Sequence, residues 1–117
     1  MWGTYPWFIE DGVDLIHPDD IDAFKKEVST CKVFECIEEK GCITLRYNDK
    51  QYRVASKLFN PVPTPKYNFG EIVKLKKNGE EATITDIMWH YDKREHYYFI
   101  AIKNKRKSKR YVESEFL

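Results

Sequence analysis

No apolar run in this 117-residue sequence approaches the roughly 20 residues that a helix needs to cross a bilayer. The N-terminal stretch MWGTYPWFIEDG has no basic segment ahead of an apolar block and no small-residue cleavage site, so it does not resemble a signal peptide. Cysteine is scarce, and Cys31, Cys36 and Cys42 lack the C-x-x-C spacing of zinc and redox sites. These absences predict a cytoplasmic protein with free thiols, no membrane partner, no disulfide framework and no metal site.

Motifs for catalysis are also lacking. The sequence contains no G-x-S-x-G, no P-loop and no H-E-x-x-H, and its three histidines, His17, His90 and His96, stand in no nucleophile, metal or phosphate pattern. His90 and His96 flank the turn YDKRE, and we expect them to be surface strand residues, with a weak metal-binding pair across the hairpin as the alternative. We therefore expect no enzymatic activity and no cofactor.

The sequence does contain enough apolar residues to form a core, and its charges are unevenly distributed along the chain. Hydrophobic residues make up 42% and aromatic residues 15%, which argues against global disorder. The formal charge of +1 conceals seven acids against two bases in residues 1–30, and twelve bases against eight acids in residues 66–117. The two ends could attract one another or present different surfaces to different partners.

One helix is predicted, over about residues 18–28. Pro18 suits the first helical position, and Ile21, Phe24 and Val28 recur at the spacing of one apolar stripe. Three acids lie at the positive end of the helix dipole, where they stabilise the helix start: Asp19, Asp20 and Asp22.

Short strands are predicted on both sides of a proline-rich linker. In the first half we expect strands at 32–37 and 42–47, joined by a turn with Gly41 left-handed, then a third strand ending at Val54 and one helical turn that buries Leu58 and Phe59. An opening strand would have to come from 5–9 or be missing, and the prolines within 61–65 should hold the two halves in a fixed relation.

In the second half a strand begins near residue 69, a turn follows at 78–79, and two longer strands precede a basic hairpin tip at 103–109. Ile84 and Ile87 are three residues apart, so we expect a β-bulge near Thr85 or Asp86 that returns Ile87 and Trp89 to one face.

A faint internal repeat links the two halves. YRVASKLF at 52–59 and RYVESEFL at 110–117 align Val54 with Val112 and Ser56 with Ser114, and both end in an apolar pair. Each copy is predicted to close its unit with a strand and a helical turn whose apolar pair, Leu58-Phe59 or Phe116-Leu117, enters the core.

These motifs carry a resemblance to a known fold family. A strand start of the form x-G-[DE]-x-V, meandering strands, a short helical turn and a terminal strand resemble the small SH3-like barrels of the Tudor and KOW type, and the RYxxxxF ending is similar to uncharacterised bacterial proteins. The resemblance implies a mainly β protein with two small SH3-like barrels in tandem and one short α-helix: residues 1–62, a linker at 63–68, and residues 69–117.

The sharpest candidate site is the basic hairpin, close in sequence to several aromatic residues. Lysine and arginine beside exposed rings are typical of nucleic-acid grooves. The candidate residues are Lys103, Lys105, Arg106, Lys107, Lys109, Arg110, Trp89, Tyr91, Tyr97 and Tyr98. The resemblance to Tudor domains adds the alternative that Trp89, Tyr91, Tyr97 and Tyr98 form a cage for a methylated side chain. A lysine-rich tip can also be solvated surface that keeps a β-edge from aggregating.

The acidic N-terminal third offers another candidate. Trp2, Tyr5, Trp7 and Phe8 either cover the first unit or form an exposed patch beside acids, which would suit a basic protein. The acids Asp19, Asp20 and Asp22 would then act as in an immunity or antitoxin protein that blocks a nuclease. We expect a non-enzymatic interaction module, a monomer or weak homodimer, that binds a protein; nucleic-acid binding and the inhibitor role are the alternatives.

Overall fold

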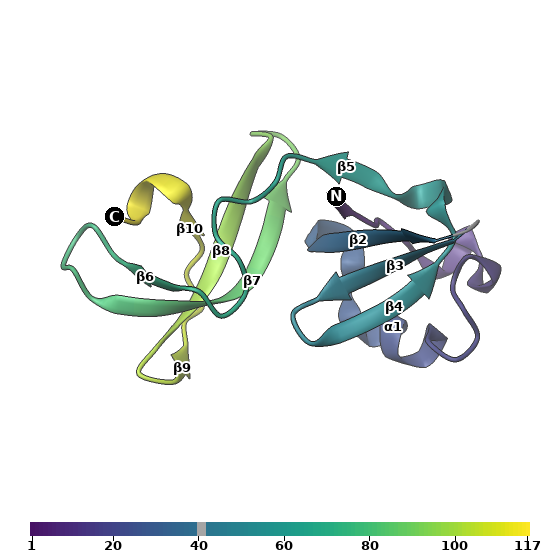
Figure 1. Cartoon of the computed structure of the whole chain (residues 1–117), viewed down its shortest axis with the longest axis horizontal. Coiled ribbons are helices and arrows are strands. Elements are labelled where there is room, and N and C mark those ends of the chain that lie inside the picture. The colour runs from purple at the N-terminus through teal and green to yellow at the C-terminus, as the bar shows by residue number, and fades with distance from the viewer. Residues whose placement is uncertain (40–41) are drawn as a thin grey trace. The chain divides into compact units, whose positions relative to one another are not determined.

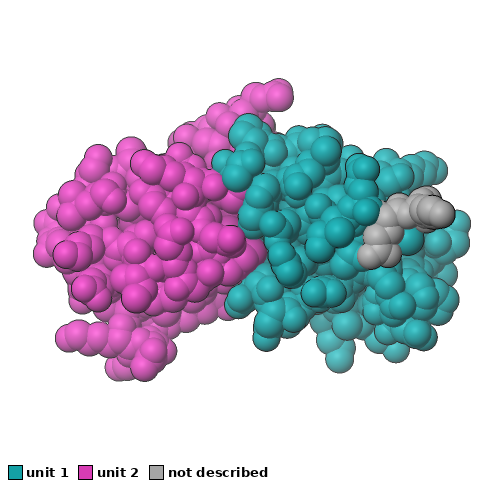
Figure 2. Space-filling model, viewed as in Figure 1, with its two compact units in different colours: residues 1–64 teal, residues 65–117 magenta. Residues whose placement is uncertain are grey.

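The computed structural model describes residues 1–39 and 42–117 and shows a mainly β protein with two antiparallel sheets (Figure 1). The chain divides into two compact units, residues 1–64 and residues 65–117, which Figure 2 distinguishes by colour. In the described part, no helix is long and apolar enough to cross a membrane.

Unit 1 is a five-stranded sheet in the order β4-β3-β2-β1-β5. Its strands are β1 (Trp2–Thr4), β2 (Val33–Glu39), β3 (Cys42–Tyr47), β4 (Lys50–Val54) and β5 (Asn60–Val62). The opening strand was expected at 5–9 but lies at β1, where Trp2 pairs with both Glu35 and Val62. The left-handed conformation expected for Gly41 lies outside the described residues.

The helix of unit 1, α1 (Ile21–Glu27), is shorter than predicted. Residues 18–20 before it form a turn in which the Asp20 amide donates to the His17 carbonyl, and the Asp20 carboxylate accepts hydrogen bonds from Arg53 of β4. At the other end, Val28 adopts left-handed backbone angles (φ 50°, ψ 71°) and is 72% exposed, so its predicted place in the buried stripe is wrong. That conformation costs an L-residue about 1–2 kcal/mol, and a glycine or asparagine usually occupies it.

Phe24 is the centre of the unit 1 core. Its ring packs at centroid distances of 5.8 Å from Tyr5, 5.8 Å from Trp7 and 5.1 Å from Tyr52, and the helix thereby covers the sheet. Short 3-10 helices connect the remaining elements of unit 1: η1 (Ile9–Asp11), η2 (Val13–Leu15), η3 (Ser29–Cys31) and η4 (Ser56–Leu58).

Unit 2 contains a second sheet in the order β10-β8-β7-β6, with β9 paired to the end of β8. Its elements are β6 (Ile72–Lys74), β7 (Glu81–His90), β8 (Glu95–Ile102), β9 (Lys105–Arg106), β10 (Tyr111–Val112) and the 3-10 helix η5 (Glu113–Glu115). The predicted bulge is confirmed, since the register of β7 against β8 shifts between Ile84 and Asp86. As expected, Ile87 and Trp89 lie on one face of β7 after the bulge, and both are buried.

The repeated segments occupy similar positions in the two units. Each runs from a strand through a 3-10 helix, and the second continues into a bridge between Phe116 and Leu75. Phe116 is buried against Tyr98 and Tyr111, whereas Leu117 is exposed and Leu58 and Phe59 are only half-buried. Within the described residues the two sheets are open, so the closed barrels that the resemblance implied are not confirmed.

Candidate functional site

The basic segment of unit 2 is a tight hairpin followed by an extended return to the sheet. Lys103 and Asn104 both have positive φ (50° and 65°), which fits a two-residue turn between the paired positions Ile102 and Lys105. The chain then leaves β9, and the Lys107 amide donates a hydrogen bond to the Ile100 carbonyl before β10 begins.

Four of the six predicted bases lie in different surroundings within unit 2. Arg106 forms an ion pair with Asp86, whose side chain is 11% exposed. The Arg110 guanidinium lies over the Tyr97 ring, 5.1 Å from its centroid. Lys103 lines a separate hollow, described below, and Lys105 is an exposed residue of β9. Arg106 and Arg110 thus have contacts within unit 2, and a joint binding role for all six bases stays a prediction.

Lys107 and Lys109 instead meet two lysines that the sequence analysis did not select. Lys76 and Lys77 follow β6, where the Lys76 amide donates to the Glu115 carbonyl and the Leu117 amide donates to the Lys74 carbonyl. This pairing with the C-terminal residues brings Lys77 to the Tyr111 ring. The Lys77 and Lys109 ammonium groups lie 6.0 Å and 4.6 Å from the centroid of that ring.

These residues form what we call the lysine groove. It consists of two neighbouring hollows of about 380 Å³ and 340 Å³ that share Leu75, Lys77, Lys109 and Tyr111. The remaining lining residues are Lys76, Glu80, Ile102, Lys107, Ser108, Ser114 and Glu115. Leu75 and Tyr111 are buried, so apolar surface lies deep in the groove and ammonium groups lie around it.

The charge of the groove is mainly positive. Lys109 is 4.0 Å from the Glu115 carboxylate and partly neutralises it, while Lys76, Lys77 and Lys107 are exposed. Like charges gathered over a low-dielectric surface attract an anion more strongly than isolated lysines do.

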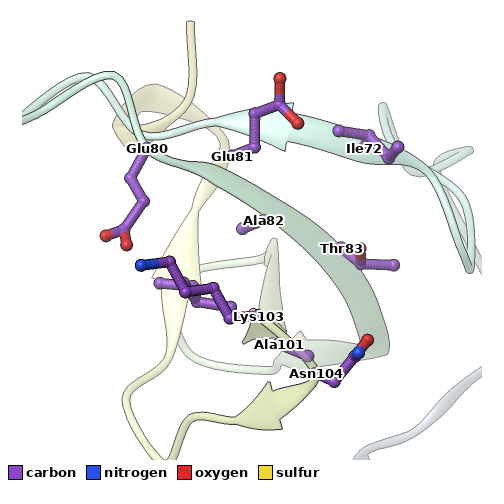
Figure 3. Close-up of a pocket in the computed structure, with 9 residues that line it drawn as sticks. Ile72, Glu80, Glu81, Ala82, Thr83, Ala101, Lys103 and Asn104 are labelled. Carbon is purple, nitrogen blue, oxygen red and sulfur yellow. The ribbon is translucent and has the colours of Figure 1, made fainter.

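A separate hollow of about 600 Å³ lies beside the groove (Figure 3) and shares Glu80 and Ile102 with it. Ala82 and Ala101 contribute short side chains, which leaves the space open, and the side chains of Lys103 and Glu80, which also line it, point toward one another. Because acids and one lysine line it together, this hollow does not favour one sign of ligand charge.

The predicted aromatic residues do not converge on one cavity. Trp89 and Tyr98 are buried, whereas Tyr97 lies at the next position of β8 and therefore on the opposite face of the sheet. Tyr91 is 43% exposed in the turn after β7. Burial raises the pKa of the Tyr98 hydroxyl, as does the Glu113 carboxylate that accepts its hydrogen bond. A methyl-lysine cage from these four rings is not formed.

The histidines also lie apart. The register pairs Trp89 with His96 and His90 with Glu95, so His90 and His96 occupy opposite faces of the hairpin and cannot form the metal-binding pair considered above. His96 is buried with its ring edge-on to Trp89 at 4.9 Å, contrary to the surface position expected. His90 accepts a hydrogen bond from the Lys93 amide through Nδ1.

Among the predicted acids, Asp20 has a structural role, because it binds Arg53 of β4. It accepts hydrogen bonds from the backbone amide and guanidinium of Arg53, at 2.8 Å and 3.0 Å to the same oxygen, and the side-chain hydrogen bond from Arg53 lowers the pKa of Asp20. Asp19 lies 3.8 Å from Arg53, and Asp22 is exposed on α1. An acidic surface here would therefore consist of Asp19 and Asp22 without Asp20.

The N-terminal rings of unit 1 divide between core and surface. Tyr5 and Trp7 are buried, as expected of residues that cover the sheet, while Phe8 is 57% exposed. The Tyr5 hydroxyl donates to the Ala55 carbonyl, and burial, followed by the charge of Asp11, raises the pKa of Tyr5 to about 12.

In residues 1–39 and 42–117, no three His, Cys, Asp or Glu side chains are placed together to hold a metal ion. Cys31, Cys36 and Cys42 are free, and burial raises the pKa of the Cys36 thiol.

Neither a curated protein nor a solved structure matches this chain. A family model does match, and it covers residues 1–117. The chain therefore belongs to a family of unknown function, DUF6960.

Proposed function

We propose that the chain is a non-catalytic interaction module that binds an acidic segment of a protein partner in the lysine groove of unit 2. The observation that carries this proposal is the placement of the Lys77 and Lys109 ammonium groups over the Tyr111 ring, with Lys76 and Lys107 among the other residues that line the groove. These lysines come from two segments that lie 30 residues apart in the sequence, Lys76-Lys77 and Lys107–Lys109. The fold, and not a single run of lysines, therefore brings them together.

The groove combines two kinds of contact that an acidic peptide needs. Ammonium groups at the rim can pair with aspartate or glutamate side chains, and the half-buried Ile102 offers apolar surface to a neighbouring aliphatic side chain. Rim charges mainly accelerate association and make it sensitive to salt, while a desolvated apolar contact slows dissociation.

A peptide fits these surroundings better than a nucleic acid does. Binding of single-stranded nucleic acid relies on rings against which bases stack, and here Trp89, Tyr98 and Tyr111 are buried. Glu80 and Glu115 also line the groove, and their carboxylates would repel a continuous phosphate backbone. A peptide can place its own charges to avoid these two acids.

The order of elements supports a related proposal about the fold. In unit 1, β1 pairs with both β2 and β5, and a 3-10 helix precedes β5. In unit 2, η5 precedes the bridge from Phe116 to Leu75. We infer from this shared order that both units derive from an SH3-like arrangement, with residues 5–32 inserted in the first.

Fluorescence anisotropy tests the function directly. The labelled probes are a peptide of about 12 residues rich in Asp, Glu and Leu, a single-stranded RNA and a duplex DNA, each at about 50 mM and 200 mM salt, the range over which phosphate contacts weaken strongly. We expect the peptide to bind more tightly than either nucleic acid, and its affinity to fall at the higher salt.

Charge reversal identifies the surface. The double variant Lys77→Glu, Lys109→Glu should weaken peptide binding at least tenfold, about 1.4 kcal/mol. The control, Lys93→Glu, reverses one charge in the turn at the opposite end of the β7–β8 hairpin and should change binding less than twofold. Tighter binding of RNA or DNA than of the peptide, lost in the double variant, would replace the proposal with the nucleic-acid alternative. Equal binding by all variants would refute both.

A further inference from the structure

Unit 1 contains an apolar pocket that is independent of the lysine groove. Its volume is about 400 Å³, within the range of pockets that hold a ligand group. We call it the Val28 pocket, and it is lined by Trp7, Phe8, Ile9, Phe24, Lys25, Val28, Ser29 and Thr30.

The pocket has buried aromatic residues beneath it and exposed apolar residues around it. Trp7 and Phe24 are 7% and 1% exposed, whereas Phe8, Ile9 and Val28 are 57%, 53% and 72% exposed. Single exposed apolar side chains are common, but three that surround one concave apolar site are typical of a surface that binds another molecule.

Val28 is unfavourable for the isolated chain in two respects. It is a β-branched residue with left-handed backbone angles, which are strained for such a residue. Val28 is also 72% exposed, so burial of its side chain within the chain does not offset that strain. Glycine or asparagine would relieve the strain at this helix end. Strain that the surrounding structure maintains is concentrated at functional sites, which gives Val28 a reason to be there.

Both neighbours of Val28 hold this conformation in place. Glu27 is buried and pairs with Lys32 and Tyr52, and the Ser29 hydroxyl donates to the Tyr5 carbonyl at 2.7 Å. The backbone on either side is thus fixed by the core. The pocket is preformed, and a ligand would not have to meet the entropic cost of ordering it.

The charges near the pocket indicate its occupant. Phe8 and Ile9 lead directly into the exposed acids Glu10 and Asp11, and the Asp11 carboxylate folds back to accept the Phe8 amide at 2.8 Å. Among the lining residues that the structure describes, Lys25 is the one base. A basic residue beside an apolar one would complement this η1 side of the pocket.

We propose that the Val28 pocket binds a leucine or aromatic side chain from a basic segment of a protein partner. The apolar side chain enters between Phe8, Ile9 and Val28, and an adjacent lysine or arginine of the partner faces Glu10 and Asp11. Binding here does not require the lysine groove, and the two surfaces would take segments of opposite charge.

Selection from a random peptide display library against the full chain tests the proposal. We expect one enriched class of peptides to carry a leucine or aromatic residue next to lysine or arginine, and Val28→Asn to weaken its binding at least tenfold. Because asparagine tolerates the left-handed conformation, the melting temperature of this variant should equal or exceed that of the parent. Val13→Asn alters a 53% exposed valine that does not line the pocket, so it should bind as the parent does.

Several outcomes would overturn the inference. No enriched class of this composition, or peptides that bind Val28→Asn as well as the parent, would show that the pocket is not a docking site. A lowered melting temperature in Val28→Asn would assign Val28 a structural role. A concentration-dependent dimer that Val28→Asn abolishes would make a second copy of this chain the occupant. The Lys77→Glu, Lys109→Glu variant should retain this class of peptides, which separates failure here from failure of the lysine groove.

Discussion

Replacement of Glu27 by alanine should strongly destabilise unit 1, because this carboxylate is the most enclosed charge that the helix contributes. Its side chain is 4% exposed, pairs with Lys32, accepts a hydrogen bond from the Tyr52 hydroxyl and lies 3.9 Å from the Lys50 ammonium. Glu27→Ala leaves the Lys32 ammonium and the Tyr52 hydroxyl without this acceptor.

The expected loss of stability follows from how far the partners of Glu27, which are Lys32, Lys50 and Tyr52, are buried. Removing one member of a buried ion pair costs about 3–5 kcal/mol. Lys32 is 20% and Lys50 is 63% exposed, so water can solvate both in part, and the lower end of that range, about 3 kcal/mol, applies. For a unit of this size such a loss lowers the melting temperature by about 12 °C or more.

Urea unfolding followed by circular dichroism at neutral pH measures this effect. Glu38→Ala, an exposed glutamate of β2, is the control and should fall within about 0.5 kcal/mol of the parent. Tyr52→Phe removes only the hydroxyl and should cost about 1.5–3 kcal/mol. The double variant should show coupling between Glu27 and Tyr52. A loss below about 1 kcal/mol for Glu27→Ala would refute the account of Glu27 as a structural charge.

Three further predictions concern pH, the end of the chain and one close backbone approach. Burial raises the pKa of Glu27, but the hydrogen bonds from its partners outweigh it, and the folded-state pKa lies below the ordinary value. Its stabilisation is therefore complete above about pH 4.3 and is lost as pH falls through the folded-state pKa, so denaturation at a series of acidic pH values should show a weaker pH dependence in Glu27→Gln than in the parent. Phe116→Ala should cost about 3–5 kcal/mol in thermal or urea unfolding because its ring is buried, whereas Leu117→Ala, at a 69% exposed position, should cost less than about 0.5 kcal/mol; similar losses would contradict the assigned burial. Gly3→Ala should destabilise unit 1 by about 1–3 kcal/mol, since the added Cβ would lie 2.6 Å from the Asn60 carbonyl oxygen, and an unchanged urea midpoint would show that β1 and β5 can separate to accommodate it.

The two proposed surfaces give the chain binding sites of different character. In the lysine groove, ammonium groups surround buried apolar residues. The Val28 pocket is lined mainly by apolar residues and lies next to the acids Glu10 and Asp11. Each is formed by residues of one unit, and each has a variant that disrupts it without changing a residue of the other. Binding experiments on the full chain can therefore assign a partner to one surface, to the other or to both.

Local sequence signals predicted much of the fold correctly. Alternating apolar residues indicated the strands, and the three-residue spacing of Ile84 and Ile87 indicated the bulge, because side chains in a strand alternate strictly between faces. The repeat around Val54 and Val112 correctly indicated a strand followed by a helical turn. These features depend on residues close together in the chain, and the sequence displays such relations directly.

The sites depended on contacts between distant residues, which only the tertiary structure reveals. Lys77 joins Lys109 because Leu75 pairs with Phe116, and no local pattern indicates that pairing. Helical periodicity placed Val28 in the core, yet the pairing of Glu27 with Lys32 and Tyr52 holds the helix end so that Val28 turns outward. Composition and periodicity thus determined the class of fold and most of its elements. Long-range pairing and the satisfaction of buried polar groups decided which side chains remain exposed.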